Sequence, residues 1–181
     1  MSDQDTEKVN EVPLHKYEIV RKAREFASSC HEMKLHPYHG TPFMDHLDST
    51  AKVALVHLDK IMETHKGNVM AACYVHLLMQ YCGMTYTEIV NQLNGAIADI
   101  VLLATPFRGR NRKEQQPLSY YEELKKDELA LFVKICSRIA NAEWSMRAKS
   151  NIFAVYYREK AEFVAFAYSE QYEQMIYYYT D

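Results

Sequence analysis

The sequence predicts an all-α fold, and three observations support this. Only five glycines and five prolines occur in the 181 residues, and most of them lie in two places, residues 37–42 and 106–117. Between these places the apolar residues recur at steps of three and four, which is the spacing of one face of a helix. No alternation of apolar and polar residues between turn residues predicts a strand.

The first half of the chain predicts helices over about residues 16–30, 43–64, 68–82 and 85–104. Thr85 and Glu88 have the spacing of a capping box, so we expect a helix to begin there. Asn94-Gly95 marks a point at which the fourth stretch can divide into two shorter helices. The faces of the first two helices are formed by Ile19, Ala23, Phe26 and Ala27, and by Leu47, Thr50, Ala54, His57, Leu58 and Ile61.

The second half predicts three further helices, over about residues 118–126, 127–148 and 150–178. The middle one carries a clear apolar stripe of Leu129, Phe132, Val133, Cys136, Ile139 and Ala140. The end of the chain is rich in tyrosine, with Tyr172, Tyr177, Tyr178 and Tyr179. Such a run favours packing, and a surface for a protein partner is the alternative.

Length and composition indicate one soluble domain. We expect a flexible segment over residues 1–15 and a single domain over 16–181. The hydrophobic share of 48% and the charged share of 25% are typical of globular proteins, and no apolar run approaches the roughly 18 residues of a membrane span. The polar, acidic N-terminus lacks the pattern of a secretory signal, so we expect a cytoplasmic protein without a membrane partner.

Cysteine spacing and net charge argue against disulfide-linked, zinc-knuckle and nucleic-acid-binding proteins. The cysteines Cys30, Cys73, Cys82 and Cys136 form no Cys-x-x-Cys pair, which argues against a zinc knuckle or a disulfide framework and favours buried, reduced thiols. A net charge of −3 with a pI near 6.2 provides no overall field for a nucleic-acid backbone, so DNA and RNA are not expected partners. Association into a homo-oligomer stays open.

The histidines are distributed unevenly. All eight lie between His15 and His76, and five of them lie between His31 and His57. Isolated histidines are usually surface residues or satisfied core residues, and we interpret His15, His57 and His65 in this way.

Basic residues form two groups. Arg108, Arg110, Arg112 and Lys113 crowd one loop, while Lys134 and Arg138 lie one helical turn apart. Arginine can clamp phosphate oxygens through bidentate hydrogen bonds, and lysine can do so as a point charge. The alternative is a solvated basic loop with a pair of cations on a helix surface.

The order of several short motifs is more specific than any one of them. The early helix that runs to His31 is followed by Gly40-x-Pro42-Phe43-x-x-His46, then by Ala71-Ala72-Cys73-Tyr74-Val75-His76, and finally by Arg138-Ile139-Ala140-Asn141. Over about residues 20–168 this series resembles the HD-domain hydrolases of the RelA/SpoT type, including the small stand-alone forms that remove pyrophosphate from guanosine alarmones. The resemblance implies an HD-domain helical bundle.

The resemblance also implies a metal site, usually for manganese, which this sequence departs from. The family's ligands are a histidine, an adjacent His-Asp pair and a later Asp, and they match His46, then His76 with Leu77, then Ser137. The Glu-Asp pair that helps to position the attacking water in the family matches Gln80 and Tyr81. We therefore expect no cofactor, with His46 and His76 as the metal ligands if there are any.

A physical argument supports this expectation. Manganese is held mainly by charged oxygen donors, which also offset its charge. Leucine has no lone pair and serine has only a neutral hydroxyl, so two neutral imidazoles would face an uncompensated dication. Metal-activated water is then not expected. Asp45 is next to His46, but neighbouring residues on a helix point about 100° apart, so it should face elsewhere.

An active enzyme is the alternative. His31, His36 and His39 could build a zinc-like site with His46 or His76, which would make the chain a metal-dependent alarmone phosphohydrolase with Mn or Zn as cofactor.

The leading hypothesis is a catalytically degenerate HD-domain protein that binds and sequesters a small phosphorylated signalling nucleotide without hydrolysing it. Tyr81 removes a negative charge and supplies a face for stacking a nucleobase, while Lys34 lies where the family carries a base-contacting arginine. A protein-interaction domain is the third reading. The predicted ligand-binding residues are His31, Lys34, His46, His76, Gln80, Tyr81, Arg108, Arg110, Arg112, Lys113, Lys134, Ser137, Arg138 and Asn141.

Overall fold

A computed structural model describes residues 17–31, 34–35 and 40–180 of the chain. Within these ranges it consists of helices, turns and one isolated β-bridge between Leu35 and Pro42, which confirms the predicted all-α class. The segment 1–15, predicted to be flexible, lies outside the described residues. In the described ranges no helix is both long enough and apolar enough to cross a membrane.

The first half of the chain departs from prediction at two helix ends. The predicted helix over 43–64 is wrong, because α2 ends at Val56 and the chain continues through a short 3-10 turn into α3. Leu58 and Ile61 continued the apolar pattern because they pack on the same core from that separate segment. The predicted helix over 68–82 breaks at Leu77. The elements are α1 (Glu18–His31), α2 (Phe43–Val56), η2 (Leu58–Lys60), α3 (Glu63–Val75) and α4 (Leu78–Tyr81).

The predicted division of the fourth stretch is confirmed. Helix α5 (Tyr86–Gln92) begins with a capping box, in which Thr85 and Glu88 satisfy each other's backbone N–H groups. Helix α6 (Gly95–Ala104) begins at Asn94, whose side-chain oxygen accepts a hydrogen bond from the N–H of Ile97 at 2.9 Å. Two independent caps therefore separate the helices.

In the second half of the chain, one predicted helix also extends beyond the observed helix end. The predicted helix over 150–178 is wrong, because the backbone turns out of helical geometry at Tyr168 and Ser169. The turn places Tyr172 in the core, where its hydroxyl donates to the carbonyl oxygen of Glu128 at 3.0 Å. The elements are α7 (Arg112–Gln115), α8 (Leu118–Leu124), α9 (Glu128–Arg147), α10 (Ile152–Ala167), η3 (Glu170–Tyr172) and α11 (Glu173–Thr180).

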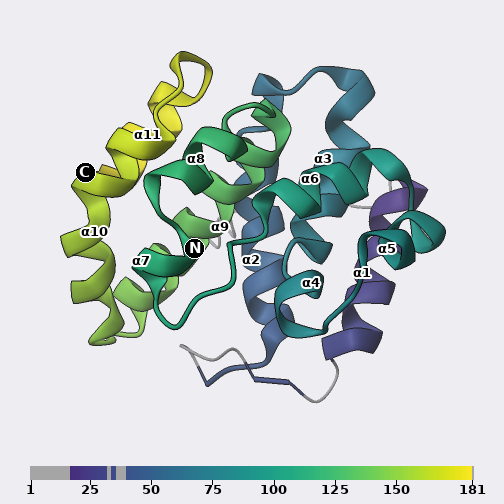
Figure 1. Ribbon diagram of the computed structural model, residues 1–181, viewed down its shortest axis with the longest axis horizontal. Helices are drawn as coiled ribbons and strands as arrows, with labels where there is room; N and C mark the ends of the chain where they lie inside the picture. The colour runs from purple at the N-terminus through teal and green to yellow at the C-terminus, as the bar shows by residue number, and fades with distance from the viewer. Residues whose placement is uncertain (1–16, 32–33, 36–39, 181) are drawn as a thin grey trace, which may run out of the picture.

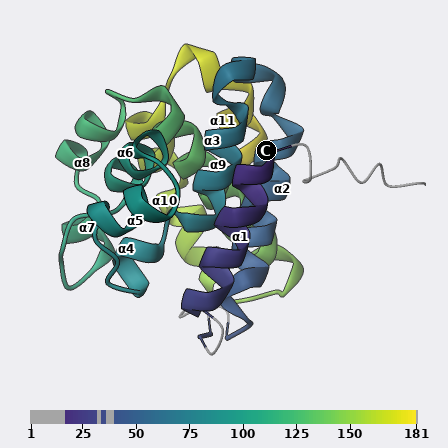
Figure 2. The same ribbon diagram turned by 90° about the vertical axis from the view of Figure 1, so that its right-hand side faces the viewer.

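Helix α9 lies at the centre of the bundle. It packs against α2, α3, α6, α8, α10 and α11, and its predicted stripe is buried from Phe132 to Ala140, with Leu129 packed at the edge. Figure 1 shows α1, α3 and α5 toward one end of the molecule and α10 and α11 at the other, with α2 between them, and Figure 2 shows the first of these ends facing the viewer. Because α9 contacts both ends, a polar residue on it is placed between two groups of helices.

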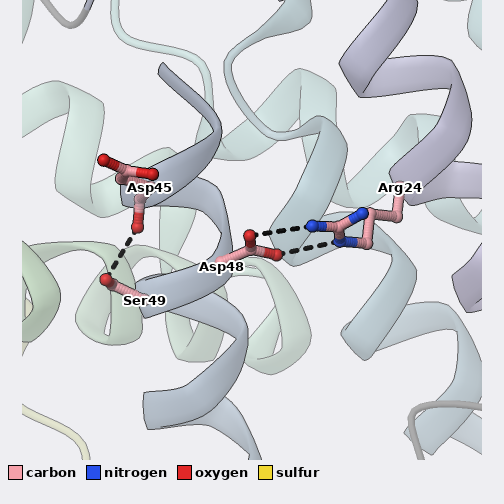
Figure 3. A network of polar contacts seen from close by, with 4 residues as sticks. All are labelled: Arg24, Asp45, Asp48 and Ser49. Carbon is pink, nitrogen blue, oxygen red and sulfur yellow. Dashed lines mark hydrogen bonds and ion pairs between the residues drawn. The ribbon is translucent and has the colours of Figure 1, made fainter. Parts of the chain in front are cut away.

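Helices α1 and α2 are joined near their middles by a bidentate ion pair. Arg24 donates from Nε and from one terminal nitrogen to the two carboxylate oxygens of Asp48, at 3.0 Å each (Figure 3). The buried Tyr74 lies beneath this pair, and its burial together with the Asp48 charge raises its pKa to about 12. The pair therefore orients α1 on the face of α2 that lies opposite the candidate site.

The cysteines match their prediction in part. Cys73 and Cys136 are buried free thiols, and burial raises the pKa of both. Cys30 and Cys82 are only half-buried, because they lie at the ends of α1 and α4, where the core gives way to surface.

Candidate functional site

Three polar side chains from three helices meet inside the bundle. His46 lies on α2, His76 follows the last residue of α3, and Ser137 lies at the middle of α9. Ser137 Oγ is 3.1 Å from Nε2 of His76 and 3.3 Å from Nε2 of His46. All three residues are buried, with exposed fractions of 2–8%. One hydroxyl therefore connects the two imidazoles.

The hydrogen bonds of this group have a defined direction. Nδ1 of His76 is 2.9 Å from the carbonyl oxygen of Cys73, which can only accept, so Nδ1 carries the proton. In a neutral imidazole Nε2 is then an acceptor, and it receives the hydroxyl proton of Ser137. Ser137 Oγ in turn accepts from Nε2–H of His46. The resulting order is His46 to Ser137 to His76 to the Cys73 carbonyl oxygen.

A pocket opens beside this chain of hydrogen bonds, and we call it the inner pocket. It encloses about 60 Å³, and none of the described residues that line it is acidic. Two are cationic, Lys134 and Arg138, and five carry amide or hydroxyl donors in addition to Ser137, whose proton is engaged by His76. Its lining consists of His46, Leu77, Gln80, Tyr81, Pro106, Gln115, Gln116, Lys134, Ser137, Arg138 and Asn141.

These residues do not fit a divalent metal ion. Within the described ranges no three His, Cys, Asp or Glu side chains are arranged to hold one. The lone pair that His76 Nε2 would offer a metal is engaged by Ser137, and the neighbouring Leu77 presents an aliphatic chain to the pocket. Asp45 is exposed on α2 while His46 is buried, so it faces elsewhere, as the helix geometry predicted (Figure 3).

The inner pocket instead carries groups suited to an anion. Asn141 lines it one turn beyond Arg138, and its side-chain amide nitrogen can donate to an anion. Its buried Oδ1, which has no hydrogen-bond partner among the described residues, is an acceptor and does not contribute to anion binding. Lys134 lies one turn before Arg138, with Nζ 5.1 Å from the centre of the Tyr120 ring. The three residues line the same pocket from α9, and Lys134 and Arg138 lie one helical turn apart, as their spacing predicted.

Arg138 is held from three sides. Its side chain is only 7% exposed, and one terminal nitrogen donates to Oε2 of Glu159 on α10 at 3.0 Å. The guanidinium also lies 4.5 Å from the centre of the Tyr156 ring and 5.1 Å from that of Phe163. Stacking and pairing leave this group with a fixed orientation at the wall of the inner pocket.

The basic loop is placed differently from the pair on α9. Arg108 and Arg110 are exposed and do not line the inner pocket, and Lys113 lines a neighbouring pocket instead. The loop is braced internally, because Glu114 accepts from the backbone N–H of Arg110 at 2.8 Å and from the Asn111 amide at 2.9 Å. The side chain of Arg112 lies outside the described part of the structure.

Of the predicted binding residues in the first half of the chain, some line the inner pocket and others do not. Nζ of Lys34 donates to the carbonyl oxygen of Tyr81 at 2.9 Å and to Cys82 Sγ at 3.4 Å, so it supports α4 from outside the inner pocket. Tyr81 does line the pocket, with its ring 5.1 Å from that of Phe43. The side chain of His31, and His36 and His39 altogether, fall outside the described residues.

Four residues that contribute to this region were missed from the sequence. Pro106, Gln115 and Gln116 reach the inner pocket from the loop that holds the four-residue helix α7, which is too short to produce a periodic signal. Glu159 reaches Arg138 from α10, and the two residues are 21 positions apart in the chain. The Gly109 turn was the available signal, because glycine and proline mark loops that return to the core.

No family model and no curated protein matches the chain. Among solved structures, it is similar to a metazoan ortholog of SpoT that is described as hydrolysing ppGpp and as having a role in starvation responses. The match has a TM-score of 0.71 and 13% sequence identity, and it covers 90% of this chain and 93% of the other. At this identity the likeness shows the fold, which is the all-α HD-domain bundle that the motif order implied.

Proposed function

We propose that this protein binds a small phosphorylated nucleotide in the inner pocket and holds it without hydrolysing it. The observation that carries the proposal is the buried hydrogen-bond chain through Ser137. A hydroxyl occupies the space between two imidazoles, where a hydrolytic site of this design would need a cation to activate water.

The charge of the inner pocket supports an anionic ligand. Its described lining contains two cations and no carboxylate, which favours an anion. One of these cations, Arg138, is also paired with Glu159 on α10. Arg138 lines the pocket beside the side-chain amides of Gln116 and Asn141, which can donate hydrogen bonds. Phosphate oxygens accept hydrogen bonds from groups of this kind.

The ligand class rests on the fold likeness together with this lining. The solved neighbour acts on ppGpp, a nucleotide with two pyrophosphate groups, and a site that keeps the donors while losing the acidic groups would retain such a molecule. A protein of this kind lowers the free concentration of the nucleotide by mass action, so it functions as a sponge.

Calorimetric titration with ppGpp tests the proposal directly. We expect binding of equal affinity in the presence of EDTA and of manganese, and anion-exchange chromatography should recover the nucleotide unchanged after prolonged incubation. Lys134→Ala should weaken binding about tenfold, because it removes one cation from the pocket. Lys52→Ala is the matched control, since Lys52 is exposed on α2 and does not line the inner pocket.

Elemental analysis separates this function from the enzymatic alternative. Release of pyrophosphate in manganese, together with about one chelator-sensitive metal ion per chain, would show an active phosphohydrolase. Mass spectrometry of small molecules released by denaturing the freshly purified protein would identify a ligand that co-purifies. Absence of binding for every nucleoside polyphosphate tested would favour the protein-interaction alternative.

A further inference from the structure

A second pocket adjoins the inner pocket, and the two share Arg138 and Gln116. We call it the outer pocket. It encloses about 160 Å³ between α8 and α10. Its wall contains three aromatic side chains, Tyr121, Phe163 and Phe166, together with charged residues that include the carboxylates Glu159 and Glu162. Its three aromatic residues were not singled out in the sequence, because they come from two helices that are far apart in the chain.

Size decides what each pocket can hold. The inner pocket, at about 60 Å³, is far below the roughly 300 Å³ at which ordinary ligand pockets begin. It has room for a phosphate group but not for a sugar and a base. A nucleotide whose phosphate enters the inner pocket must therefore extend beyond it, and the outer pocket is adjacent because Arg138 and Gln116 line both.

The chemistry of the outer pocket suits a flat ring. Tyr121 packs against Phe163 and Phe166, with ring centres 6.1 Å and 5.4 Å apart, and all three rings line the pocket. Glu162, which is exposed at the rim, supplies a carboxylate. The negative charge of this carboxylate repels phosphate, and its oxygens can accept hydrogen bonds from the N–H groups of a base edge.

We propose that the ligand spans both pockets, with a phosphate group beside Ser137 and Asn141 and its base among the aromatic rings of the outer pocket. Arg138 lies between them and orients the ligand. This inference rests on the proposed function and extends it, because it assigns a base subsite formed by α8 and α10. The chemical class selected is a base-bearing nucleotide whose base has N–H donors, in preference to free pyrophosphate.

Titration of ppGpp and of inorganic pyrophosphate into paired variants tests the inference. Phe166→Ala should weaken ppGpp binding about tenfold, since stacking on an aromatic side chain contributes strongly to base binding, and should leave pyrophosphate binding unchanged. Glu162→Gln should weaken ppGpp binding severalfold and strengthen pyrophosphate binding slightly. Tyr157→Ala is the control, because Tyr157 is an exposed aromatic residue of α10 that lines neither pocket.

The outcomes distinguish a failure of the base subsite from a failure of the proposed nucleotide binding. If wild type binds ppGpp and both variants bind it equally well, the base subsite is wrong while the proposed function stands. If Phe166→Ala weakens the binding of ppGpp and of pyrophosphate alike, the ring supports the fold and the inference fails. Glu162→Gln tests the base subsite independently, because its side chain lies at the surface and its replacement should not disturb the fold. If wild type binds neither probe nor any other nucleotide, the proposed function and this inference are both overturned.

Discussion

Ser137 Oγ lies within hydrogen-bonding distance of the Nε2 atoms of both His46 and His76, at 3.3 and 3.1 Å. The single hydroxyl thereby joins α2, the end of α3 and α9 at the centre of the bundle. A cation between two imidazoles would use the lone pairs of both nitrogens, whereas the hydroxyl uses one lone pair and one proton. The two arrangements exclude each other.

Ser137→Ala should destabilise the protein by about 1–3 kcal/mol, because it removes the shared partner of two buried imidazole nitrogens. Urea unfolding measures the loss. Ser49→Ala is the control on α2, where the hydroxyl donates to the Asp45 carbonyl oxygen at 2.7 Å near the surface (Figure 3); we expect a change within about 0.5 kcal/mol. Equal effects from the two variants would mean that the buried chain contributes nothing to stability.

The double variant Leu77→Asp with Ser137→Asp should bind manganese. It places two carboxylates beside His46 and His76, which supplies the charged oxygen donors that manganese prefers. Electron paramagnetic resonance counts the bound ions, and about one per chain is expected. The matched control is Leu77→Asn with Ser137→Asn, which has the same shape without charge. Manganese binding by wild type at the same level would contradict the metal assignment.

Glu159→Gln should strengthen pyrophosphate binding severalfold, because the carboxylate competes with the ligand for Arg138. It should also cost about 1 kcal/mol of stability, since Arg138 is buried while Glu159 is 29% exposed and partly screened. Glu143→Gln removes a surface partner of Arg147 and should change neither quantity. Weaker pyrophosphate binding in Glu159→Gln would instead make Glu159 part of the binding machinery.

Gly109→Ala should destabilise the loop that borders the inner pocket by about 1–3 kcal/mol. A Cβ there would lie 2.6 Å from Cβ of Glu114 and 3.0 Å from its carbonyl carbon, so the backbone must shift. In Gly95→Ala, at the start of α6, the added Cβ meets nothing within 4 Å. This variant should stabilise the protein by about 0.4–1 kcal/mol, because alanine lowers the conformational entropy of the unfolded chain. Thermal unfolding of both variants checks the contrast in sign.

The capping box of α5 should make stability depend on pH. Hydrogen bonds from the backbone N–H and then the hydroxyl of Thr85 lower the pKa of Glu88 below its usual value of 4.5. Because the folded pKa is the lower one, the stabilisation is complete above pH 4.5 and is lost as the pH falls through the lowered value. The melting temperatures of wild type and Glu88→Gln should therefore differ above pH 4.5 and converge below it. A gap that is independent of pH would contradict this assignment.

Local patterns determined the helix content, the capping box at Thr85, and the spacing that places Lys134, Arg138 and Asn141 on one face of α9. These features depend on neighbours within about one helical turn, which the sequence displays directly. The substitution of carboxylates by Leu77 and Ser137 was equally visible, once the motif order suggested an HD-domain arrangement.

Only the tertiary structure decided where α2 and α10 end, since Leu58 and Tyr172 reach the same core from separate segments. It alone brought Ser137 between two histidines that lie 91 and 61 residues away in the chain, and Glu159 to Arg138. Distances of this kind follow from the packing of whole helices around α9, and no local pattern encodes them. The sequence thus determined which donors are present, while packing decided that they face one another.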